Sequence, residues 1–133
     1  MTFIFAGANS STISHKLVGG KNTVFDIAAP TSGTWSGISI YQATNLTQNV
    51  DMTFNGGGNT PTFEITGVVY LPHSSVTLSG SVSKATNGVA CMVFVVQTVT
   101  FNGGGYVADR ANCPSAGVTL PTGSLAGRTS LVD

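Results

Sequence analysis

One seven-residue pattern recurs three times in this chain at nearly equal steps. Its copies are MTFNGGG at Met52–Gly58, VTLSGSV at Val76–Val82 and VTFNGGG at Val99–Gly105. Repeats with a period of this order are typical of stacked architectures, in which each repeat buries its apolar face only against its neighbours. The sequence therefore predicts an all-β fold with little helix: a right-handed parallel β-helix (β-solenoid) with coils of about 23 residues.

Each copy alternates between apolar and polar side chains, as a strand with one buried face does. The apolar pairs are expected to point inward and to stack from coil to coil: Met52 and Phe54, Val76 and Leu78, Val99 and Phe101. The polar pairs are expected to form outward ladders and a possible interaction face: Thr53 and Asn55, Thr77 and Ser79, Thr100 and Asn102. The glycines that follow are expected to form a corner, where positive φ or close packing excludes a Cβ atom.

Further strand-like segments precede these copies. Apolar strands are expected at Gly37–Tyr41, Gly67–Leu71 and Cys91–Val95, and weaker, earlier ones at Thr2–Phe5 and Thr23–Ile27, which are separated by a similar step. No stretch shows a clear period of 3.6 residues, and Gly, Pro, Asn and β-branched residues interrupt the chain every few positions. We therefore expect one β domain spanning residues 1–133.

Composition narrows the range of partners. Only 8% of the 133 residues are charged and the formal net charge is zero, so no basic field attracts nucleic acid or an anionic membrane. The longest apolar run, Val89–Val96, is far shorter than the roughly 18 residues of a membrane span. We expect no nucleic-acid partner and no membrane span in this chain.

The two cysteines, Cys91 and Cys113, are separated in sequence by close to the length of one coil. They could therefore lie one above the other on neighbouring coils, within the Cα separation that a disulfide tolerates. A disulfide would place the protein in an oxidising compartment; one buried and one exposed free thiol remain the alternative. Because His15 and His73 are remote in sequence from each other and lack metal-ligand spacing, we expect no metal site.

The glycine runs and acidic residues offer little chemistry. No lysine follows either glycine run, so a phosphate-binding loop is not expected. The carboxylates show no spacing that pairs them for glycoside hydrolysis: Asp26, Asp51, Glu64, Asp109 and Asp133. We expect no catalytic residue, no cofactor and no enzymatic activity. Trp35 is either a sugar- or partner-binding aromatic or a residue that caps the core.

Several strings, taken in order, resemble the C-terminal region of TadE/TadG-like Flp (Tad) pilus-assembly proteins. They are TFIFAGAN at Thr2–Asn9, IAAPTSGTWSGISIYQ at Ile27–Gln42, FEITGVVYLPHSSVTLSG at Phe63–Gly80 and the strand Cys91–Asn102, followed by Cys113 and Ser130–Asp133. The chain departs from the family pattern at Ala43–Thr44, where an Asp-Arg pair is usual. Fuller members of the family carry an N-terminal membrane segment and earlier coils, so the resemblance implies that this chain is the C-terminal part of a longer protein.

The resemblance implies a non-catalytic structural or interaction module of a bacterial Tad/Flp pilus or cell-surface apparatus, supporting pilus assembly or adhesion. Its expected location is periplasmic or extracellular, at the cell surface. Its expected partners are pilus or cell-envelope proteins, or further copies that associate through the solenoid ends. Two alternatives remain open: an ice-binding β-solenoid that uses the outward Thr, Asn and Ser rows, and a carbohydrate-binding or carbohydrate-processing β-helix of the adhesin or phage-spike type.

Overall fold

A computed structural model of the chain describes residues 1–10, 12, 14–19, 25–55, 63–79, 89, 91–102 and 111–120. These residues form seven β-strands and one short 3₁₀-helix, η1: β1 Phe3–Phe5, β2 His15–Gly19, β3 Phe25–Ala28, β4 Ile38–Gln42, β5 Val50–Asn55, β6 Phe63–Ser79, β7 Met92–Asn102 and η1 Cys113–Ala116. No α-helix occurs in the described part of the chain. The expectation of a mostly β fold with little helix is confirmed for these residues.

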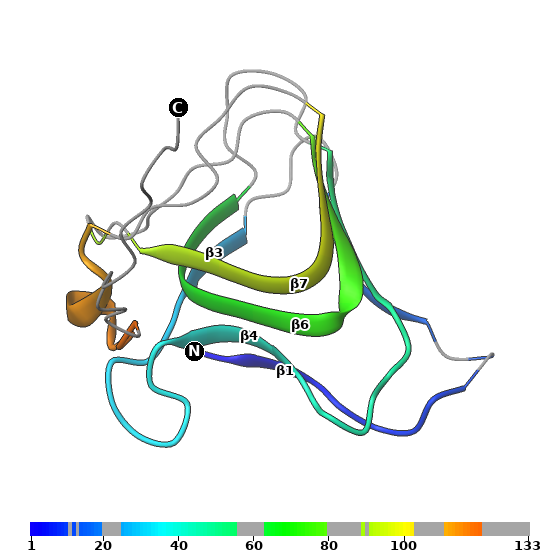
Figure 1. Ribbon diagram of the computed structural model, residues 1–133, viewed down its shortest axis with the longest axis horizontal. Helices are drawn as coiled ribbons and strands as arrows, with labels where there is room; N and C mark the ends of the chain where they lie inside the picture. Colours follow the sequence, from blue (N-terminus) through cyan, green and yellow to red (C-terminus); the bar gives the residue numbers. More distant parts are fainter. Residues whose placement is uncertain are drawn as a thin grey trace, which may run out of the picture.

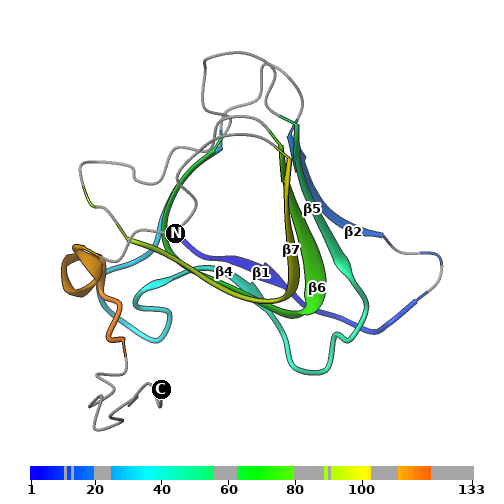
Figure 2. The ribbon, with the colours of Figure 1, turned by 45° about the horizontal axis from the view of Figure 1, so that its top comes forward.

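Every strand pairing in the sheet is parallel, and β6 lies at its centre. Successive parts of β6 pair with β3, then β4, then β5, while β7 pairs with β6 over almost its whole length. Strands β1 and β2 extend the sheet beyond β4 and β5 respectively. Figure 1 shows that β6 and β7 follow the same bent path, and Figure 2 shows β5 and β2 along one side of it. The strands form a nearly closed, barrel-like arrangement.

The register between β5, β6 and β7 confirms the predicted alignment of the repeat. Thr53 of β5 lies opposite Thr77 of β6, and Thr77 lies opposite Thr100 of β7. A slip of one residue would turn every inward side chain to the other face, so this register is strongly specified wherever one face is buried. Both steps of the sequence repeat therefore join structurally equivalent positions.

Earlier in the chain the step is longer than the predicted length. Ile4 pairs with Tyr41, Tyr41 with Tyr70, and Tyr70 with Val95. The sequence separation between paired residues decreases along the chain, and only the last separation approaches the predicted coil length of about 23 residues. The two early segments also do not pair with each other, because β1 pairs with β4 and β3 pairs with β6. The additional length lies in connections such as residues 30–37 and 43–49, which leave the strand path and return to it.

The apolar core fills the space enclosed by the strands. Its buried members are Leu17, Ile27, Ile40, Leu46, Val50, Met52, Ile65, Val69, Leu71, Val76, Leu78 and Met92. The partly buried residues packed against them belong to the outermost strands: Phe3, Phe5, Phe25, Phe94, Val96 and Val99. The inward side chains of the central strands are thus covered by the strands on either side, whereas those of the outermost strands are covered on one side only.

The predicted inward stack is confirmed for Met52, Val76 and Leu78, which are at most 3% exposed. The predicted burial is wrong for Phe101, whose side chain is 54% exposed although it lies opposite Leu78 in the same inward row. The reason is that β7 is the last described strand on that side of the sheet, so no described strand covers Phe101. The side chain of Phe54 lies outside the described part of the structure.

Candidate interaction face

The outward ladder expected from the repeat lies on β5, β6 and β7. Thr53, Thr77 and Thr100 form one continuous row across the three strands. Thr53 and Thr77 are half-buried between their neighbours, and Thr100 at the end of the row is exposed. Neighbouring strands are about 4.8 Å apart, so the row repeats at that interval.

The second predicted row follows the same register. Asn55 lies opposite Ser79, and Ser79 lies opposite Asn102. Asn102 is exposed, whereas the side chains of Asn55 and Ser79 lie outside the described part of the structure. The backbone therefore aligns all six ladder positions, and the described side chains are Thr53, Thr77, Thr100 and Asn102.

Hydrogen bonds tie this face together one row further along. The Thr98 hydroxyl donates to Ser75 Oγ on the neighbouring strand at 2.7 Å, and the Thr53 hydroxyl donates to Asp51 Oδ1 on its own strand at 2.6 Å. The Ser75 backbone N–H donates to Asn49 Oδ1 at 2.9 Å. The two side-chain bonds restrict the rotamers of the Thr53, Ser75 and Thr98 hydroxyl groups.

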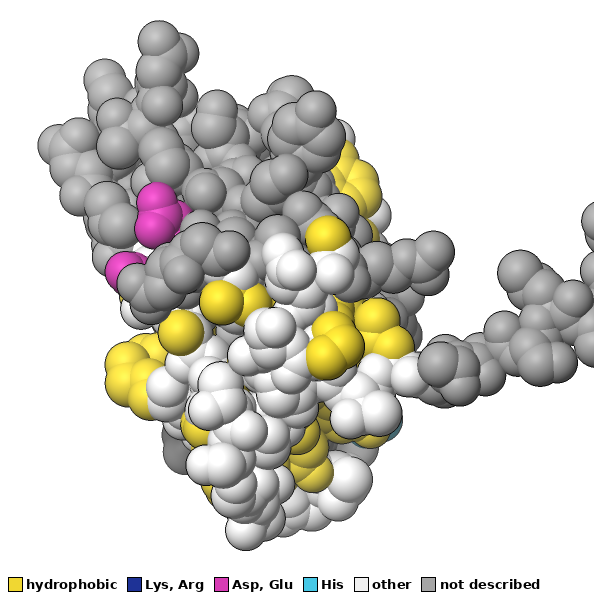
Figure 3. Space-filling view, turned by 90° about the vertical axis from the view of Figure 1, so that its left-hand side faces the viewer, with side chains coloured by type: hydrophobic (Ala, Val, Ile, Leu, Met, Phe, Trp, Pro, Cys, Tyr) yellow, Lys and Arg dark blue, Asp and Glu magenta, His cyan; other side chains and the backbone are white. Residues whose placement is uncertain are grey.

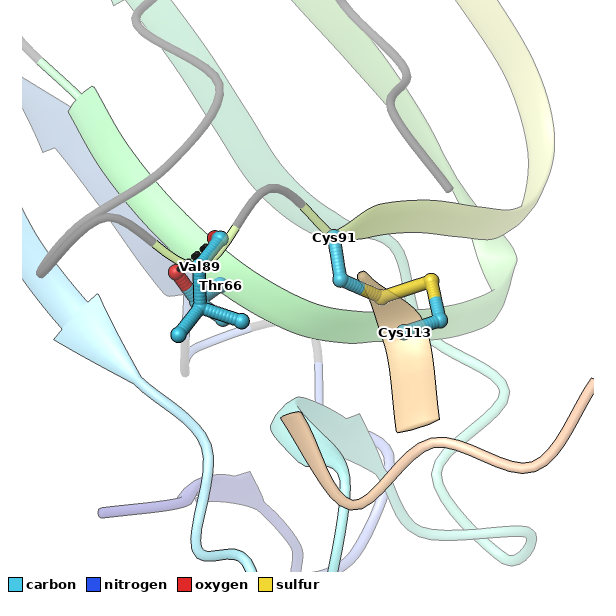
Figure 4. Close-up of a disulfide and its surroundings, with 4 residues drawn as sticks. All are labelled: Thr66, Val89, Cys91 and Cys113. Atoms are coloured by element: carbon cyan, nitrogen blue, oxygen red, sulfur yellow. Dashed lines mark hydrogen bonds between the residues drawn. A yellow bond between two sulfur atoms is a disulfide. The ribbon is translucent and has the colours of Figure 1, made fainter. Parts of the chain in front are cut away.

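The predicted disulfide is present. Cys91 and Cys113 are bonded, both are almost completely buried, and their Cα atoms are 4.7 Å apart (Figure 4). The suggested placement, one cysteine above the other on neighbouring coils, is not what the structure shows, because Cys113 begins the 3₁₀-helix η1 and does not pair with the sheet. Pro114 follows Cys113 and has no backbone N–H to give to a strand ladder, which favours a helical turn there.

The disulfide ties one unit, the segment 111–120, to the residue before β7, and the same unit packs against the loop at 30–37. Ser36 Oγ donates to the Gly117 carbonyl oxygen at 3.2 Å. Gly37 and Gly117 both have positive φ, and a Cβ atom on Gly37 would lie 2.6 Å from the Gly117 carbonyl oxygen. Only glycine fits this close backbone approach. Beneath the unit lies a second small core of Cys91, Cys113, Ala116 and Val118.

Among the described residues, few charged side chains lie on the side of the molecule shown in Figure 3. Figure 3 shows mostly hydrophobic, uncharged and a few acidic side chains among the coloured residues there. Asp26 and Glu64 lie directly opposite each other on β3 and β6, and Asp109 and Asp133 lie outside the described residues. In the described part of the chain no three His, Cys, Asp or Glu side chains gather as metal ligands would.

Trp35 packs against the sheet. Its ring centroid lies 4.9 Å from that of Tyr41, and Tyr41 stacks on Tyr70 at 5.5 Å with an interplanar angle of 12°. The two tyrosines are register partners on β4 and β6, and the same row ends in Ile4 and Val95. The stacked tyrosine faces are therefore occupied by each other, and they stiffen this side of the sheet.

The pattern of alternation misses one buried polar residue, Gln42. Its side chain is 0% exposed. Its Nε2 donates to the carbonyl oxygens of Leu46 (2.9 Å) and Gln48 (2.8 Å), and its Oε1 accepts from Ser74 Oγ (2.9 Å) and from the His73 backbone N–H (3.3 Å). Gln42 thus satisfies the backbone where the chain turns from β4 toward β5.

A sequence signal for Gln42 does exist. In ISIYQ the inward positions after Ile38 are Ile40 and Gln42, so the amide stands where a third apolar side chain is expected. Ser74 on β6 is likewise a buried polar residue that satisfies the backbone, because its hydroxyl oxygen accepts a hydrogen bond from the Val50 backbone N–H at 2.9 Å. Buried polar side chains of this kind are retained when they are hydrogen-bonded.

Comparison with protein-family models, with curated proteins and with solved structures finds no match to this chain. In the described residues no helix combines the length and the hydropathy that a membrane crossing requires.

Proposed function

We propose that the chain is a right-handed parallel β-solenoid whose later coils are about 23 residues long. The handedness follows from the rule that parallel β crossovers are right-handed in about 98% of cases. We further propose that it acts as a non-catalytic structural and interaction module of a bacterial Tad/Flp pilus or a related cell-surface apparatus. In that role it supports pilus assembly or adhesion through its partners, which are pilus or cell-envelope proteins.

The observation that carries this proposal is the in-register polar ladder. Thr53, Thr77 and Thr100 align across three parallel strands, and the row has no charged member. Side chains held in fixed rows by a sheet lose little conformational entropy when a partner binds. A regular row of uncharged hydroxyl side chains suits a protein that docks into an assembly.

The disulfide supports the proposed location. Cys91 and Cys113 form a buried disulfide, which hints at an oxidising compartment outside the cytoplasm because cytosolic thiols are kept reduced. A pilus module would meet such an oxidising environment in the periplasm or at the cell surface.

The family resemblance supports the proposed system. Its strings coincide with structural units: Ile27–Gln42 runs from the end of β3 through β4, Phe63–Gly80 contains β6, and Cys91–Asn102 contains β7. The resemblance therefore extends over β4, β6 and β7 of one parallel sheet.

The test is complementation of a deletion strain of the encoding bacterium. A chain carrying Thr77→Glu and Thr100→Glu places two like charges opposite each other on the ladder, whereas Thr44→Glu alters an exposed loop residue. We expect the wild type and Thr44→Glu to restore surface pili, counted by electron microscopy, and the double variant to restore few. Normal piliation in the deletion strain itself would contradict the proposal.

The same rows favour a second candidate, ice binding. Hydroxyl and methyl groups of Thr53, Thr77 and Thr100 recur at the strand spacing of about 4.8 Å, and such regular rows can order water. Thermal hysteresis of the purified chain decides the matter. Hysteresis that Thr77→Glu abolishes supports ice binding, and its absence removes this candidate without touching the pilus proposal.

A further inference from the structure

Strand β7 is the outermost strand on one side of the sheet. One of its edges pairs with β6 over ten residue pairs. Its other edge pairs with no strand among the described residues. With eleven residues, β7 thus presents a long row of backbone N–H and C=O groups that a further strand can pair with.

The inner rows at β7 are also incompletely covered. Each inward residue of β7 has a register partner on β6: Phe94 with Val69, Val96 with Leu71, Val99 with Val76, Phe101 with Leu78. The β6 members are at most 3% exposed, whereas three β7 members are half-buried and Phe101 is 54% exposed. The same rows are therefore buried one strand earlier and open at β7, and a further layer would cover them.

The two ends of the stack differ in their protection against strand pairing. Strand β7 contains no charged residue, no proline and no glycine. At the opposite end β2 carries the exposed Lys16, β3 carries the exposed Asp26, and β1 is only three residues long. Charged side chains and short strands at a sheet edge are common protections against pairing, and β7 has neither.

We propose that β7 pairs antiparallel with β7 of a second copy of this chain, across a two-fold axis. A two-fold contact needs a surface that is complementary to itself, and an uncharged strand with aliphatic and aromatic inner residues meets that requirement. This pairing would cover Phe94, Val96, Val99 and Phe101 from both copies. It stands independently of the proposed role in a pilus.

The positions of the inward side chains define the register of this contact. Inward residues alternate up to Val96 and resume at Val99, because the β6–β7 register shifts between Leu71 and Ser75. In an antiparallel pair, directly opposite side chains lie on the same face. With the axis between Gln97 and Thr98, Phe94 lies opposite the second copy's Phe101, and Val96 opposite its Val99. The outward Val95 then lies opposite the second copy's Thr100.

The first experiment measures mass against concentration by size-exclusion chromatography with light scattering. We expect the full chain to move from monomer to dimer and to stop there. Phe101→Lys should raise the dissociation constant at least tenfold, because it places a charge in the contact. Ile4→Lys is the matched control, since Ile4 is 48% exposed on β1 at the other end, and it should dimerise as the wild type does.

Three outcomes overturn the proposal. A monomer at every concentration shows that no second copy covers β7. An open series of larger multimers shows that β7 pairs with the opposite end of the next copy. Equal weakening by Ile4→Lys and Phe101→Lys places the contact elsewhere. Circular dichroism checks that each variant is folded, and Val95→Lys, at a residue 42% exposed, replaces Phe101→Lys if that chain does not fold.

The second experiment tests the register with cysteines. Opposed residues of an antiparallel pair have Cα atoms about 4.5–5.5 Å apart, within disulfide range. Val95→Cys chains mixed with Thr100→Cys chains should form a covalent dimer under mild oxidation on non-reducing gels, and neither chain should do so alone. Efficient cross-linking of Val95→Cys alone, or none in the mixture, refutes the predicted register.

Discussion

Replacing Gln42 with leucine tests whether the buried amide holds the turn between β4 and β5. Leucine is close to glutamine in size but can form none of its four hydrogen bonds. The bonds to the Leu46 carbonyl and from the Ser74 hydroxyl are fully buried, whereas those involving Gln48 and His73 are only partly buried. Water can replace the hydrogen bonds to Gln48 and His73. The loss of stability therefore arises mainly from the buried groups of Leu46 and Ser74, which are left without a partner.

The magnitude can be worked from these contacts. An unsatisfied buried polar group costs about 1–3 kcal/mol, so two groups cost about 4 kcal/mol together. Burying a leucine side chain returns about 1.5–3 kcal/mol of transfer free energy. We therefore expect Gln42→Leu to lower the free energy of unfolding by about 2 kcal/mol. Thr34 is an exposed residue of the loop at 30–37, so the control Thr34→Leu should change the free energy of unfolding by less than about 0.5 kcal/mol.

Urea unfolding followed by circular dichroism measures both variants. The midpoint should fall for Gln42→Leu while the slope m stays unchanged, because the surface exposed on unfolding is the same. Equal stability of Gln42→Leu and Thr34→Leu would refute the view that the amide network fixes this turn. A gain in stability for Gln42→Leu would show that apolar burial outweighs the lost hydrogen bonds.

Two further changes test the unit held by the disulfide. Gly37→Ala should lower the free energy of unfolding by more than about 2 kcal/mol, because it adds a Cβ clash with the Gly117 carbonyl to the cost of positive φ. Gly33 also has positive φ, but the space around it is open, so Gly33→Ala should lower the free energy of unfolding, measured with urea, by only about 1 kcal/mol. Equal losses for the two variants would contradict the close packing at Gly37. Replacing Cys91 and Cys113 together by alanine should cost about 3 kcal/mol, and an unchanged melting temperature would show that the unit is held without the bond.

The register of β5, β6 and β7 is predictable from the sequence because the repeat carries two signals at once. Alternation indicates which side chains point inward, and the equivalent threonines indicate which residues align. Thr53, Thr77 and Thr100 satisfy both signals, and the observed pairs match them. The disulfide between Cys91 and Cys113 is also present as predicted, although the spacing of one repeat does not explain it, because Cys113 lies in η1 outside the sheet.

The earlier strands are harder to align because their connections differ in length. The loop at 30–37 contains Trp35 and packs against Tyr41 and Gly117, so tertiary contacts rather than a repeat determine its length. The position of Cys113 in η1 is equally non-local, because the unit at 111–120 packs on a loop far earlier in the chain. Alternation alone overlooks Gln42, because it treats every inward position as apolar.

Phe101 shows the limit of a repeat most directly. The strings TFNG at Thr53–Gly56 and Thr100–Gly103 are identical, and the pairing places both phenylalanines in the row of Leu78. Leu78 lies between two strands and is 3% exposed, while Phe101 lies on the last described strand and is 54% exposed. Sequence alternation thus determines the direction of a side chain, whereas its burial depends on the next layer. A large apolar side chain in an inward position without that layer is the feature that a second copy at β7 would explain.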